Sequence, residues 1–223
     1  MKREIIITSD GSTTIHLPEW NEQYHSKHGA IQEAYHVFIK NGLEYFKETH
    51  KELNEISILE IGFGTGLNSF ITFIENDILT NYVGVEAYPV AVEEVTKLNY
   101  VAELNAEENR TFFNKMHAAS WGEKHEINDS FWLTKRQQFF KEIDDKECYD
   151  IIYFDAFGAR VQPDLWTEAI FKIMYEALKE NGVLVTYSAK GSVRRAMQAA
   201  GFLVERLPGP PGKREMLRAT KTL

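Results

Sequence analysis

The sequence is poor in the residues that build disulfides and metal centres. It contains a single cysteine, Cys148, so no disulfide can form within the chain and no thiolate metal site can be completed. We expect Cys148 to be a small apolar residue at the edge of a strand. The histidines show no ligand spacing, since His25 and His28 lie three apart with no acidic or cysteine ligands arranged around them, and we predict no metal site.

Long hydrophobic runs are also absent. No apolar stretch approaches the roughly 18 residues that a membrane span needs. The N-terminal segment MKREIIITSDGS lacks both the apolar core of a signal peptide and the composition of a transit peptide. We therefore expect a soluble, cytoplasmic protein. With 43% hydrophobic residues in 223, the chain can form one sizeable core, and neither a repeat nor a low-complexity linker divides it.

Positive charge is scarce overall but not near the C-terminal end. The formal net charge of −8 argues against a polyanionic partner. From Lys190 onward, however, eight Lys and Arg residues accompany only two Glu residues, so this segment carries +6 and the rest of the chain −14. Such an asymmetry is one hint of contact with a nucleic acid through a local basic patch, although basic faces are usually just solvated.

The order of strand-like and helix-like segments predicts the fold class. Alternation around Asp10-Gly11 indicates an N-terminal hairpin, and residues 29–46 have helical spacing. Strands are expected at 56–62, 82–87, 131–135, 149–157 and 182–188, helices at 67–75, 90–104, 165–182 and 192–201, and a closing strand pair at 202–207 and 214–220. Strands that alternate with helices predict an α/β, Rossmann-like fold whose mainly parallel sheet is wound on both faces, with the closing pair antiparallel.

Three glycines at every second position follow the first buried strand, in the segment LEIGFGTGLN. In a doubly wound sheet, ligands bind outside the carboxyl ends of the strands where the winding switches direction. Gly62, Gly64 and Gly66 let the backbone approach a ligand where a Cβ atom would collide. Glu86, at the end of the next strand, can accept hydrogen bonds from both hydroxyls of a ribose. Together these residues predict a ribose-bearing cofactor.

The spacing of the glycines separates the candidate cofactors. A nicotinamide fingerprint would place its third glycine where Leu67 stands, and a phosphate-binding P-loop would need Lys and Ser or Thr in place of Leu67 and Asn68. The pattern G-x-G-x-G, preceded by Glu60, is instead typical of S-adenosylmethionine-dependent methyltransferases, in which no pyrophosphate has to be held. The sequence therefore favours S-adenosylmethionine as the cofactor.

Four separated segments resemble one family. YHSKHGAIQEAYHVF, LEIGFGTGLN, FDAFGARVQPDLWTEAIF and GPPGKREML occur here in the same order as in the methyltransferase domain of MnmC, a bifunctional enzyme that modifies the tRNA wobble uridine, and in its stand-alone, MnmD-like form. The resemblance covers nearly the whole chain and leaves no residues for the oxidase domain of MnmC. It implies a class I methyltransferase fold, with residues 1–50 as a hairpin and helix extension and residues 51–223 as the methyltransferase domain.

The resemblance also implies a reaction and a set of site residues. The reaction is methyl transfer from S-adenosylmethionine to the amine of 5-aminomethyl-uridine, usually 2-thiolated, giving the 5-methylaminomethyl form. Asp155 is implied as the group that handles the amine proton, because a primary alkylamine is mostly protonated at neutral pH; it could otherwise be a helix-capping or loop-fixing carboxylate. The expected cofactor-binding residues are Tyr24, Glu60, Gly62, Phe63, Gly64, Gly66, Leu67, Asn68, Glu86 and Ala87, of which Tyr24 and Phe63 could equally be core residues.

The acceptor is expected to be a wobble base that leaves its stack. We choose Phe157 as the aromatic residue that stacks on this base. Lys190, Arg195, Lys213 and Arg214 are expected to contact backbone phosphates around the anticodon, with Arg194 a weaker candidate. The sequence predicts neither the oligomeric state nor the tRNAs that are used.

This chain departs from the family pattern at two places, and two other functions stay open. It has Asp155-Ala156-Phe157-Gly158-Ala159 where the family usually has Asp-Gly-Phe-Ala-Pro, and Thr134-Lys135 where the family usually has Gly-Asp near the adenine. The substrate loop and the adenine site can therefore differ from the family's. A methyltransferase acting on a small amine or another acceptor, and a non-catalytic nucleotide-binding or partner-binding module, are the alternatives.

Overall fold

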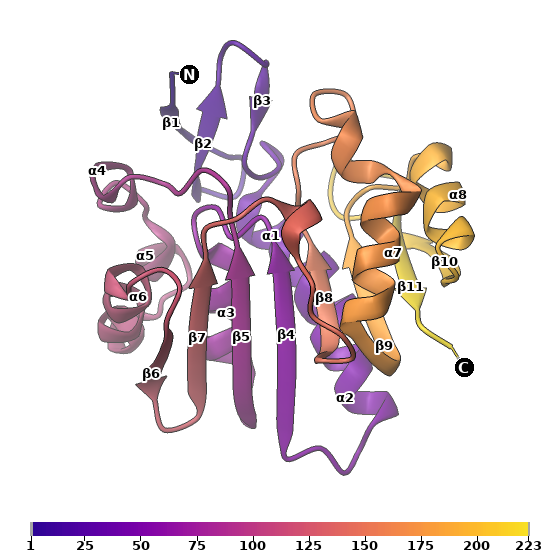
Figure 1. Ribbon diagram of the computed structural model, residues 1–223. Coiled ribbons are helices and arrows are strands. Elements are labelled where there is room, and N and C mark those ends of the chain that lie inside the picture. Colours follow the sequence, from indigo (N-terminus) through magenta and orange to yellow (C-terminus); the bar gives the residue numbers. More distant parts are fainter. Residues whose placement is uncertain (1, 223) are drawn as a thin grey trace.

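Two sheets organise residues 2–222, the part of the chain that the computed structural model describes (Figure 1). The smaller sheet has the strand order β1-β2-β3, and the larger has the order β10-β11-β9-β8-β4-β5-β7-β6. The strands are β1 (Glu4–Ile7), β2 (Thr13–Leu17), β3 (Glu22–Gln23), β4 (Glu55–Ile61), β5 (Leu79–Val85), β6 (Lys124–Asn128), β7 (Phe131–Arg136), β8 (Tyr149–Phe154), β9 (Leu178–Thr186), β10 (Leu203–Pro208) and β11 (Glu215–Thr220).

Helices cover both faces of the larger sheet (Figure 1). They are α1 (Ala30–Ala34), η1 (Tyr35–Glu44), α2 (Tyr45–Thr49), α3 (Leu67–Glu75), α4 (Val92–Val95), α5 (Tyr100–Glu103), η2 (Glu107–Asn109), α6 (Arg110–Ala118), η3 (Phe140–Glu142), η4 (Pro163–Trp166), α7 (Glu168–Ala177) and α8 (Gly191–Ala199). Residues of η1, α3 and α6 pack in one core and residues of α7 and α8 in the other.

The centre of the larger sheet is parallel. β4 pairs with β5 on one side and with β8 on the other, and the parallel pairing continues to β7 and β9. β11 and β10 add antiparallel strands at one edge and β6 at the other. The predicted α/β class with a mainly parallel, doubly wound sheet and a C-terminal antiparallel pair is confirmed. The arrowheads of β4, β5, β7 and β8 all point towards the end of the molecule where the β1–β3 sheet lies (Figure 1).

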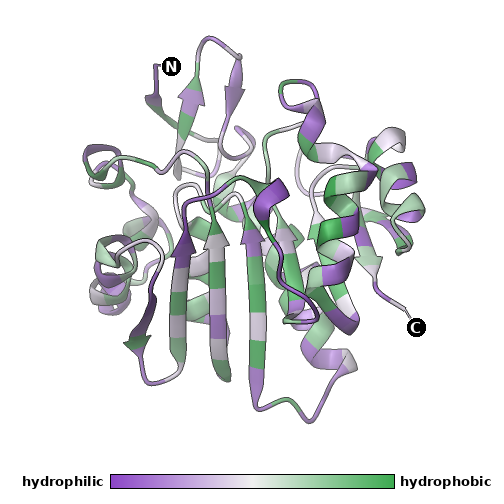
Figure 2. Cartoon of the chain, viewed as in Figure 1, coloured by the Kyte–Doolittle hydropathy of each residue, from purple (hydrophilic) through white to green (hydrophobic). Residues whose placement is uncertain are grey.

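The side chains of the central strands alternate between the two cores, as residues of a strand must. Ile58 and Ile151 face the core of η1 and α3, whereas Leu59 and Ile152 face the core of α7. Hydrophobic residues recur along β4, β5 and β8 in the middle of the sheet (Figure 2). Strands buried on both faces explain why this part of the sequence consists of short, nearly continuous apolar runs.

The N-terminal helix predicted at 29–46 is confirmed and extends to Thr49, but its middle, η1, is a π-helix. The residue pattern gave no sign of this wider winding. Gly42 lies in η1 where a Cβ atom would be only 3.0 Å from the Cγ2 atom of Val185 and 3.3 Å from the ring of Tyr153. Glycine therefore lets this helix pack closely on β8 and β9.

The helix predicted at 90–104 is wrong as a continuous helix. Two short helices, α4 and α5, replace it, and Asn99 stands between them. The side-chain oxygen of Asn99 accepts a hydrogen bond from the Thr13 backbone N–H (2.8 Å), and its amide nitrogen donates to the Gly11 carbonyl (2.9 Å). This contact with the β1–β2 connection is tertiary, so helical periodicity could not reveal it.

The helix predicted at 165–182 ends at Ala177, five residues before the expected glycine stop. Residues from Leu178 onward belong to β9. The N–H of Asn181 donates to the Lys221 carbonyl (2.9 Å), and the N–H of Lys221 donates to the Gly182 carbonyl (3.0 Å). Backbone pairing with a segment 40 residues away thus makes Asn181 and Gly182 part of the sheet, although their local sequence favours the end of a helix. The strand expected at 131–135 is confirmed as β7, whereas β6 and α6 were not predicted.

The N-terminal hairpin forms, but with a longer connection than a two-residue turn. Ile7 pairs with Thr13, which leaves five residues between the strands. Asp10 stabilises this loop, since its Oδ1 accepts hydrogen bonds from the Thr8 hydroxyl (2.7 Å) and from the Ser12 N–H (3.2 Å).

No helix among residues 2–222 has the length and apolar character to cross a membrane. Within the same residues, no three His, Cys, Asp or Glu side chains come together as metal ligands would.

Candidate active site

The three glycines form a tight turn where β4 ends. Gly62, Gly64 and Gly66 have φ values of 90°, 48° and 73°, in the left-handed region that favours glycine. The N–H groups of Gly62 and Phe63 both donate to the carbonyl of Val85 (3.0 and 3.1 Å), which ties the turn to the end of β5. A Cβ atom on Gly62 would lie 2.6 Å from the carbonyl oxygen of Asp155. The turn and the residue after β8 are therefore in direct contact.

Glu86 follows β5 and lies against the same turn. Its Oε2 accepts from the Gly64 N–H (3.1 Å) and its Oε1 from the Tyr88 N–H (3.0 Å). Burial raises the pKa of the Glu86 carboxyl above its ordinary value. Ala87, the next residue, is partly buried beside it. The structure thus brings together Glu86 and the glycines, as the sequence predicted.

Asn68 connects two carboxyl groups beneath the turn. Its side-chain nitrogen donates to Oε1 of Glu60 (2.9 Å) and to Oδ2 of Asp155 (2.9 Å). Glu60 is fully buried, and its Oε2 accepts from the Tyr82 hydroxyl (2.9 Å). Burial raises the pKa of the Glu60 carboxyl well above its ordinary value. Both oxygens of Glu60 are occupied by protein donors, so Glu60 fixes Asn68, and Asn68 in turn fixes Asp155.

Asp155 is the first residue after β8 and is partly buried. Burial, followed by the negative charge of Glu33, raises the pKa of the Asp155 carboxyl to about 7, although the Asn68 hydrogen bond and the Lys213 ammonium oppose this shift. A carboxyl group with such a pKa can both hold and release a proton near neutral pH. Its Oδ2 is oriented by Asn68, so the group has a defined direction as well as a shifted pKa.

Aromatic residues stand over the turn from the N-terminal sheet. The ring of Tyr24 lies on Gly64, where an added Cβ atom would be 3.0 Å from its Cδ1. The same ring packs edge to face against Phe157 at a centroid distance of 5.0 Å, and Trp20 does so at 5.8 Å. Burial raises the pKa of the Tyr24 hydroxyl. Tyr24 therefore lies between the glycine turn and the loop that follows Asp155.

Arg160 ties that loop to the N-terminal sheet. Its guanidinium donates to the carbonyls of Trp20 and Asn21 (3.0 Å each) and to the Glu22 carboxylate (2.9 Å). Sequence reasoning missed Arg160, although it lies in one of the four family-like segments. The residues around the β2–β3 turn and the Asp155 loop thus form one wall over the glycine turn.

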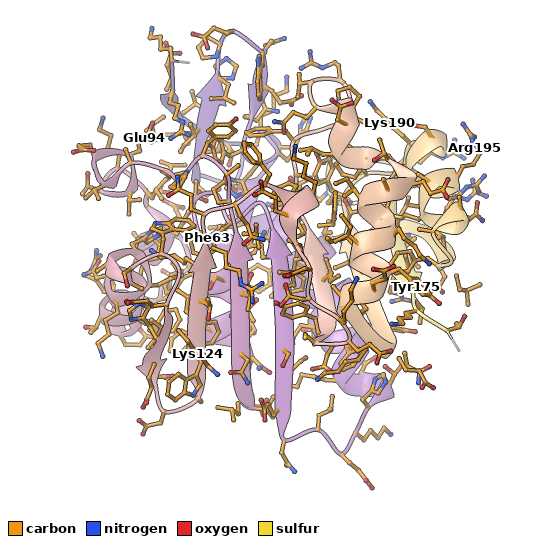
Figure 3. The ribbon with its side chains drawn as sticks, viewed as in Figure 1. Phe63, Glu94, Lys124, Tyr175, Lys190 and Arg195 are labelled. Atoms are coloured by element: carbon orange, nitrogen blue, oxygen red, sulfur yellow. The ribbon has the colours of Figure 1, made fainter. Side chains whose placement is uncertain are left out.

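Two of the expected cofactor-binding side chains lie in the core instead. The Phe63 side chain is 3% exposed and fills the space over Gly84, where an added Cβ atom would come within 2.2 Å of its ring. Leu67 is buried in the same core. These side chains point away from the turn's outer surface, so any contribution of Phe63 and Leu67 to a ligand has to come from their backbone. Figure 3 shows Phe63 at the carboxyl end of the strands.

Lys135 lies in β7 beside Gly84 and is 2% exposed. Its Nζ donates to the His117 carbonyl (2.9 Å) and lies 5.1 Å from the centroid of the Trp121 ring. Burial lowers the pKa of the Lys135 ammonium to about 8. The ammonium group is therefore held inside the molecule by a carbonyl and an aromatic face.

Seven of the eight basic residues of the C-terminal segment divide into two groups, and the eighth, Arg194, is half-buried in α8. Four of them pair with carboxylates, in the ion pairs Arg206 with Glu215, Arg218 with Glu205, Lys221 with Glu147 and Lys213 with Glu33. Lys190, Arg195 and Arg214 are exposed, and within residues 2–222 they form no ion pair. Lys190 immediately precedes α8 and Arg195 lies in the middle of this helix (Figure 3). The structure thus separates Lys213 from the exposed basic residues with which the sequence grouped it.

A cavity of about 430 Å³ opens beside the Asp155 loop. Its lining includes Tyr24, Glu33, Phe157, Tyr187 and Lys213. Glu33 and Tyr187 were not predicted. Glu33 had a signal in the sequence, since it lies at helical spacing with Ala30, Ala34 and Val37 on a stripe that is otherwise apolar. The sequence carries no such signal for Tyr187, because the role of Tyr187 depends on the side chains that the fold brings next to it.

Comparisons with known proteins identify a family and a fold. Residues 101–222 match the model of a family of S-adenosyl-L-methionine-dependent methyltransferases. Among curated proteins, the tRNA 5-methylaminomethyl-2-thiouridine biosynthesis bifunctional protein MnmC of Burkholderia mallei (strain SAVP1) is 30% identical over 234 residues, which cover 96% of this chain and 34% of that protein. Its counterpart in Marinomonas sp. (strain MWYL1) is 25% identical over 214 residues, which cover 90% of this chain and 31% of that protein. The chain thus spans about a third of the length of these relatives.

Solved structures agree with the family match. MNMC2 from Aquifex aeolicus has a TM-score of 0.77 and 25% sequence identity, covering 99% of this chain and 70% of that chain. Spermidine synthase from Thermotoga maritima, with a TM-score of 0.57 and 14% identity, covers 98% of this chain and 69% of that chain and shares the fold. On the match over residues 101–222, supported by these relatives, this chain belongs to a family of S-adenosyl-L-methionine-dependent methyltransferases.

Proposed function

We propose that this protein methylates the amine of 5-aminomethyl-uridine, 2-thiolated or not, at the wobble position of tRNA. The names of the Burkholderia mallei and Marinomonas relatives support a role in 5-methylaminomethyl-2-thiouridine synthesis. The observation that carries the proposal is the Asp155 carboxyl, which is oriented by Asn68, adjoins the glycine turn and has its pKa raised to about 7. A tRNA acceptor also supports a cytoplasmic location.

The residues at the turn fit S-adenosylmethionine. At Gly62 and Gly64 an added Cβ atom would enter space that the backbone and Tyr24 occupy, so only glycine permits the close turn. Glu86 offers carboxylate oxygens at the end of β5, and Gly66, Asn68 and Ala87 complete the expected set around them. When bound, the cofactor supplies an electrophilic methyl group on a positively charged sulfur. Carboxylates and the Tyr24 ring suit a positive charge, whereas Lys135 is turned away to the His117 carbonyl.

Asp155 acts on the acceptor amine. The protonated amine has no lone pair for attack, so one proton has to leave the nitrogen before or during methyl transfer. The ionised Asp155 carboxylate accepts this proton, and a raised pKa makes it a stronger base than an ordinary aspartate. The Asn68 amide holds Oδ2, which leaves Oδ1 for the amine. A positioned base of this kind typically contributes about 10²–10⁴-fold to the rate.

Residues beyond Asp155 bind the rest of the acceptor. Phe157, already packed edge to face on Tyr24, offers a ring on which the extruded base can stack. The exposed Lys190, Arg195 and Arg214 contact phosphates around the anticodon, which gives affinity without sequence information. Lys213 lines the cavity instead, where its ammonium pairs with Glu33.

Each part of the chain has a role in this proposal. Residues 51–223 form the methyltransferase domain. Residues 1–50 form an extension whose hairpin and helix pack on that domain and whose Tyr24 covers the glycine turn. Arg160 holds the two parts together at the rim of the site.

The decisive experiment uses labelled S-adenosylmethionine and tRNA from cells that lack this protein, followed by nucleoside analysis of the digest. Label in 5-methylaminomethyl-uridine, thiolated or not, is the expected result. Tight binding of S-adenosylmethionine without label in tRNA would overturn the proposed acceptor. A small amine would then become the leading candidate.

A further inference from the structure

Glu33 is a carboxylate that lines the cavity together with residues 156–158, which follow Asp155. Its side chain is only 8% exposed, and its Oε2 accepts from the Ser26 N–H (2.9 Å). Its Oε1 forms an ion pair with the ammonium of Lys213. A buried carboxylate is costly unless a positive charge or hydrogen bonds compensate it, so this position requires a cation.

Tyr187 completes a site for that cation. The Nζ atom of Lys213 lies 3.8 Å from the centroid of the Tyr187 ring. The hydroxyl of Tyr187 donates to the Ala156 carbonyl (2.8 Å), which fixes the ring next to the residue that follows Asp155. A carboxylate together with an aromatic face is the arrangement that binds an alkylammonium group. In the protein without acceptor, the group bound there is the primary ammonium of Lys213.

The acceptor in the proposed reaction carries the same chemical group, a protonated primary amine on a CH₂. We infer that Glu33 and Tyr187 form the recognition site for the acceptor's ammonium group, and that Lys213 occupies this site until the acceptor displaces it. This inference rests on the proposed function. It assigns to the amine a binding site distinct from the base-stacking and phosphate contacts.

The position of Glu33 also suits the next step. The hydroxyl of Tyr187 holds its ring against Ala156, the residue that follows Asp155, and the negative charge of Glu33 contributes to the raised pKa of the Asp155 carboxyl. An ammonium group held by Glu33 and Tyr187 therefore lies next to the chain segment that carries the carboxylate which has to take its proton. Glu33 selects and positions the amine, and Asp155 is the catalytic residue.

The test compares two tRNAs that differ only at the wobble position, one with 5-aminomethyl-uridine and one with uridine. Their dissociation constants are measured at fixed salt in the presence of S-adenosylhomocysteine. We expect the wild-type protein to prefer the aminomethyl form by about tenfold, as befits one charge-assisted contact. Glu33→Gln should abolish the preference and leave the affinity for the uridine form unchanged. Glu44→Gln, an exposed residue of the same helix, is the matched control and should keep the tenfold preference.

Lys213 gives a test in the opposite direction. If Lys213 competes with the acceptor for Glu33, Lys213→Met should increase the preference for the aminomethyl tRNA. If Lys213 binds phosphate instead, the variant should lower the affinity for both tRNAs equally, and this result would overturn the displacement step.

Further outcomes separate this inference from the proposed function. A Glu33→Gln protein that keeps the wild-type preference overturns the inference, and so does a wild-type protein that methylates the aminomethyl tRNA without preferring it. A wild-type protein that neither prefers nor methylates that tRNA overturns the proposed function itself. If Glu33→Gln no longer binds S-adenosylhomocysteine, Tyr187→Leu is measured in its place, and an unchanged preference there also overturns the inference.

Discussion

Gly62 and Asp155 touch through their backbones, since a Cβ atom on Gly62 would lie 2.6 Å from the Asp155 carbonyl oxygen. The glycine turn and Asp155 directly follow strands β4 and β8, which are neighbours in the sheet but lie far apart in the sequence. A change at Gly62 should therefore disturb both cofactor binding and the position of the base.

Gly62→Ala should lower the affinity for S-adenosylmethionine at least tenfold and reduce the melting temperature. The matched control is Gly122→Ala. Gly122 has a similar φ of 86°, so it shares the conformational cost of about 1–2 kcal/mol, but an added Cβ atom there meets nothing within 4 Å. Calorimetric titration of both variants separates collision from backbone strain. Equal losses in the two variants would contradict our placement of the site.

Asp155→Asn should reduce the turnover number by about 10²–10⁴-fold because the amide cannot accept the amine proton. The affinity for S-adenosylmethionine should stay within about twofold, since our proposal assigns the cofactor mainly to the glycine turn and Glu86. Asp164→Asn, an exposed carboxylate in the same loop region, should retain full activity. Loss of cofactor binding in Asp155→Asn would place Asp155 in the cofactor site instead.

The rate should depend on pH through the Asp155 carboxyl. Only its ionised form accepts a proton, and its pKa is raised to about 7, so kcat/KM should rise as pH increases through about 7 and level off above it. An ordinary aspartate would place this rise near pH 4. A profile measured between pH 5 and 9 at constant ionic strength tests the prediction, and a flat profile over this range would contradict it.

The same raised pKa affects stability. The folded protein binds the Asp155 proton more tightly than the unfolded chain, so the stabilisation from this group is present at low pH and is lost as pH rises through about 7. Asp155→Asn removes the unfavourable ionisation. We expect this variant to melt a few degrees higher than the wild type at pH 8, with a smaller difference at pH 5.5. Thermal melts followed by circular dichroism at the two pH values provide the measurement.

Lys190→Ala combined with Arg195→Ala should weaken tRNA binding and leave the affinity for S-adenosylmethionine unchanged. If each side chain contacts one phosphate, the slope of log affinity against log salt should become less steep by about 1.4–1.8. The control is the double variant Lys51→Ala with Lys172→Ala, which removes the same number of positive charges from exposed positions outside the site. A double variant that binds tRNA with the wild-type affinity and slope would remove Lys190 and Arg195 from the interface.

Patterns within short stretches of the sequence predicted the features that depend only on neighbouring residues. The apolar runs of β4 and β8, the three glycines and the carboxylate at Glu86 are each contiguous in the sequence, and strand order brings them to one edge of the sheet. Where local preference and long-range pairing disagreed, the prediction failed. Asn181 and Gly182 read as the end of a helix, but backbone hydrogen bonds with Lys221 place them in the sheet.

By itself the sequence determined the fold class and the glycine turn, because these follow from periodicity and from backbone freedom within a few residues, and its resemblance to a known family implied Asp155 as a candidate base. Only the tertiary structure decided which groups surround that base. Lys213 reads as one of a run of surface cations, yet Glu33 from a helix 180 residues away pairs with it inside a cavity. Burial and charge neighbours are set by packing between distant segments, so the pKa of Asp155 and the cation site beside it could not be read from the chain alone.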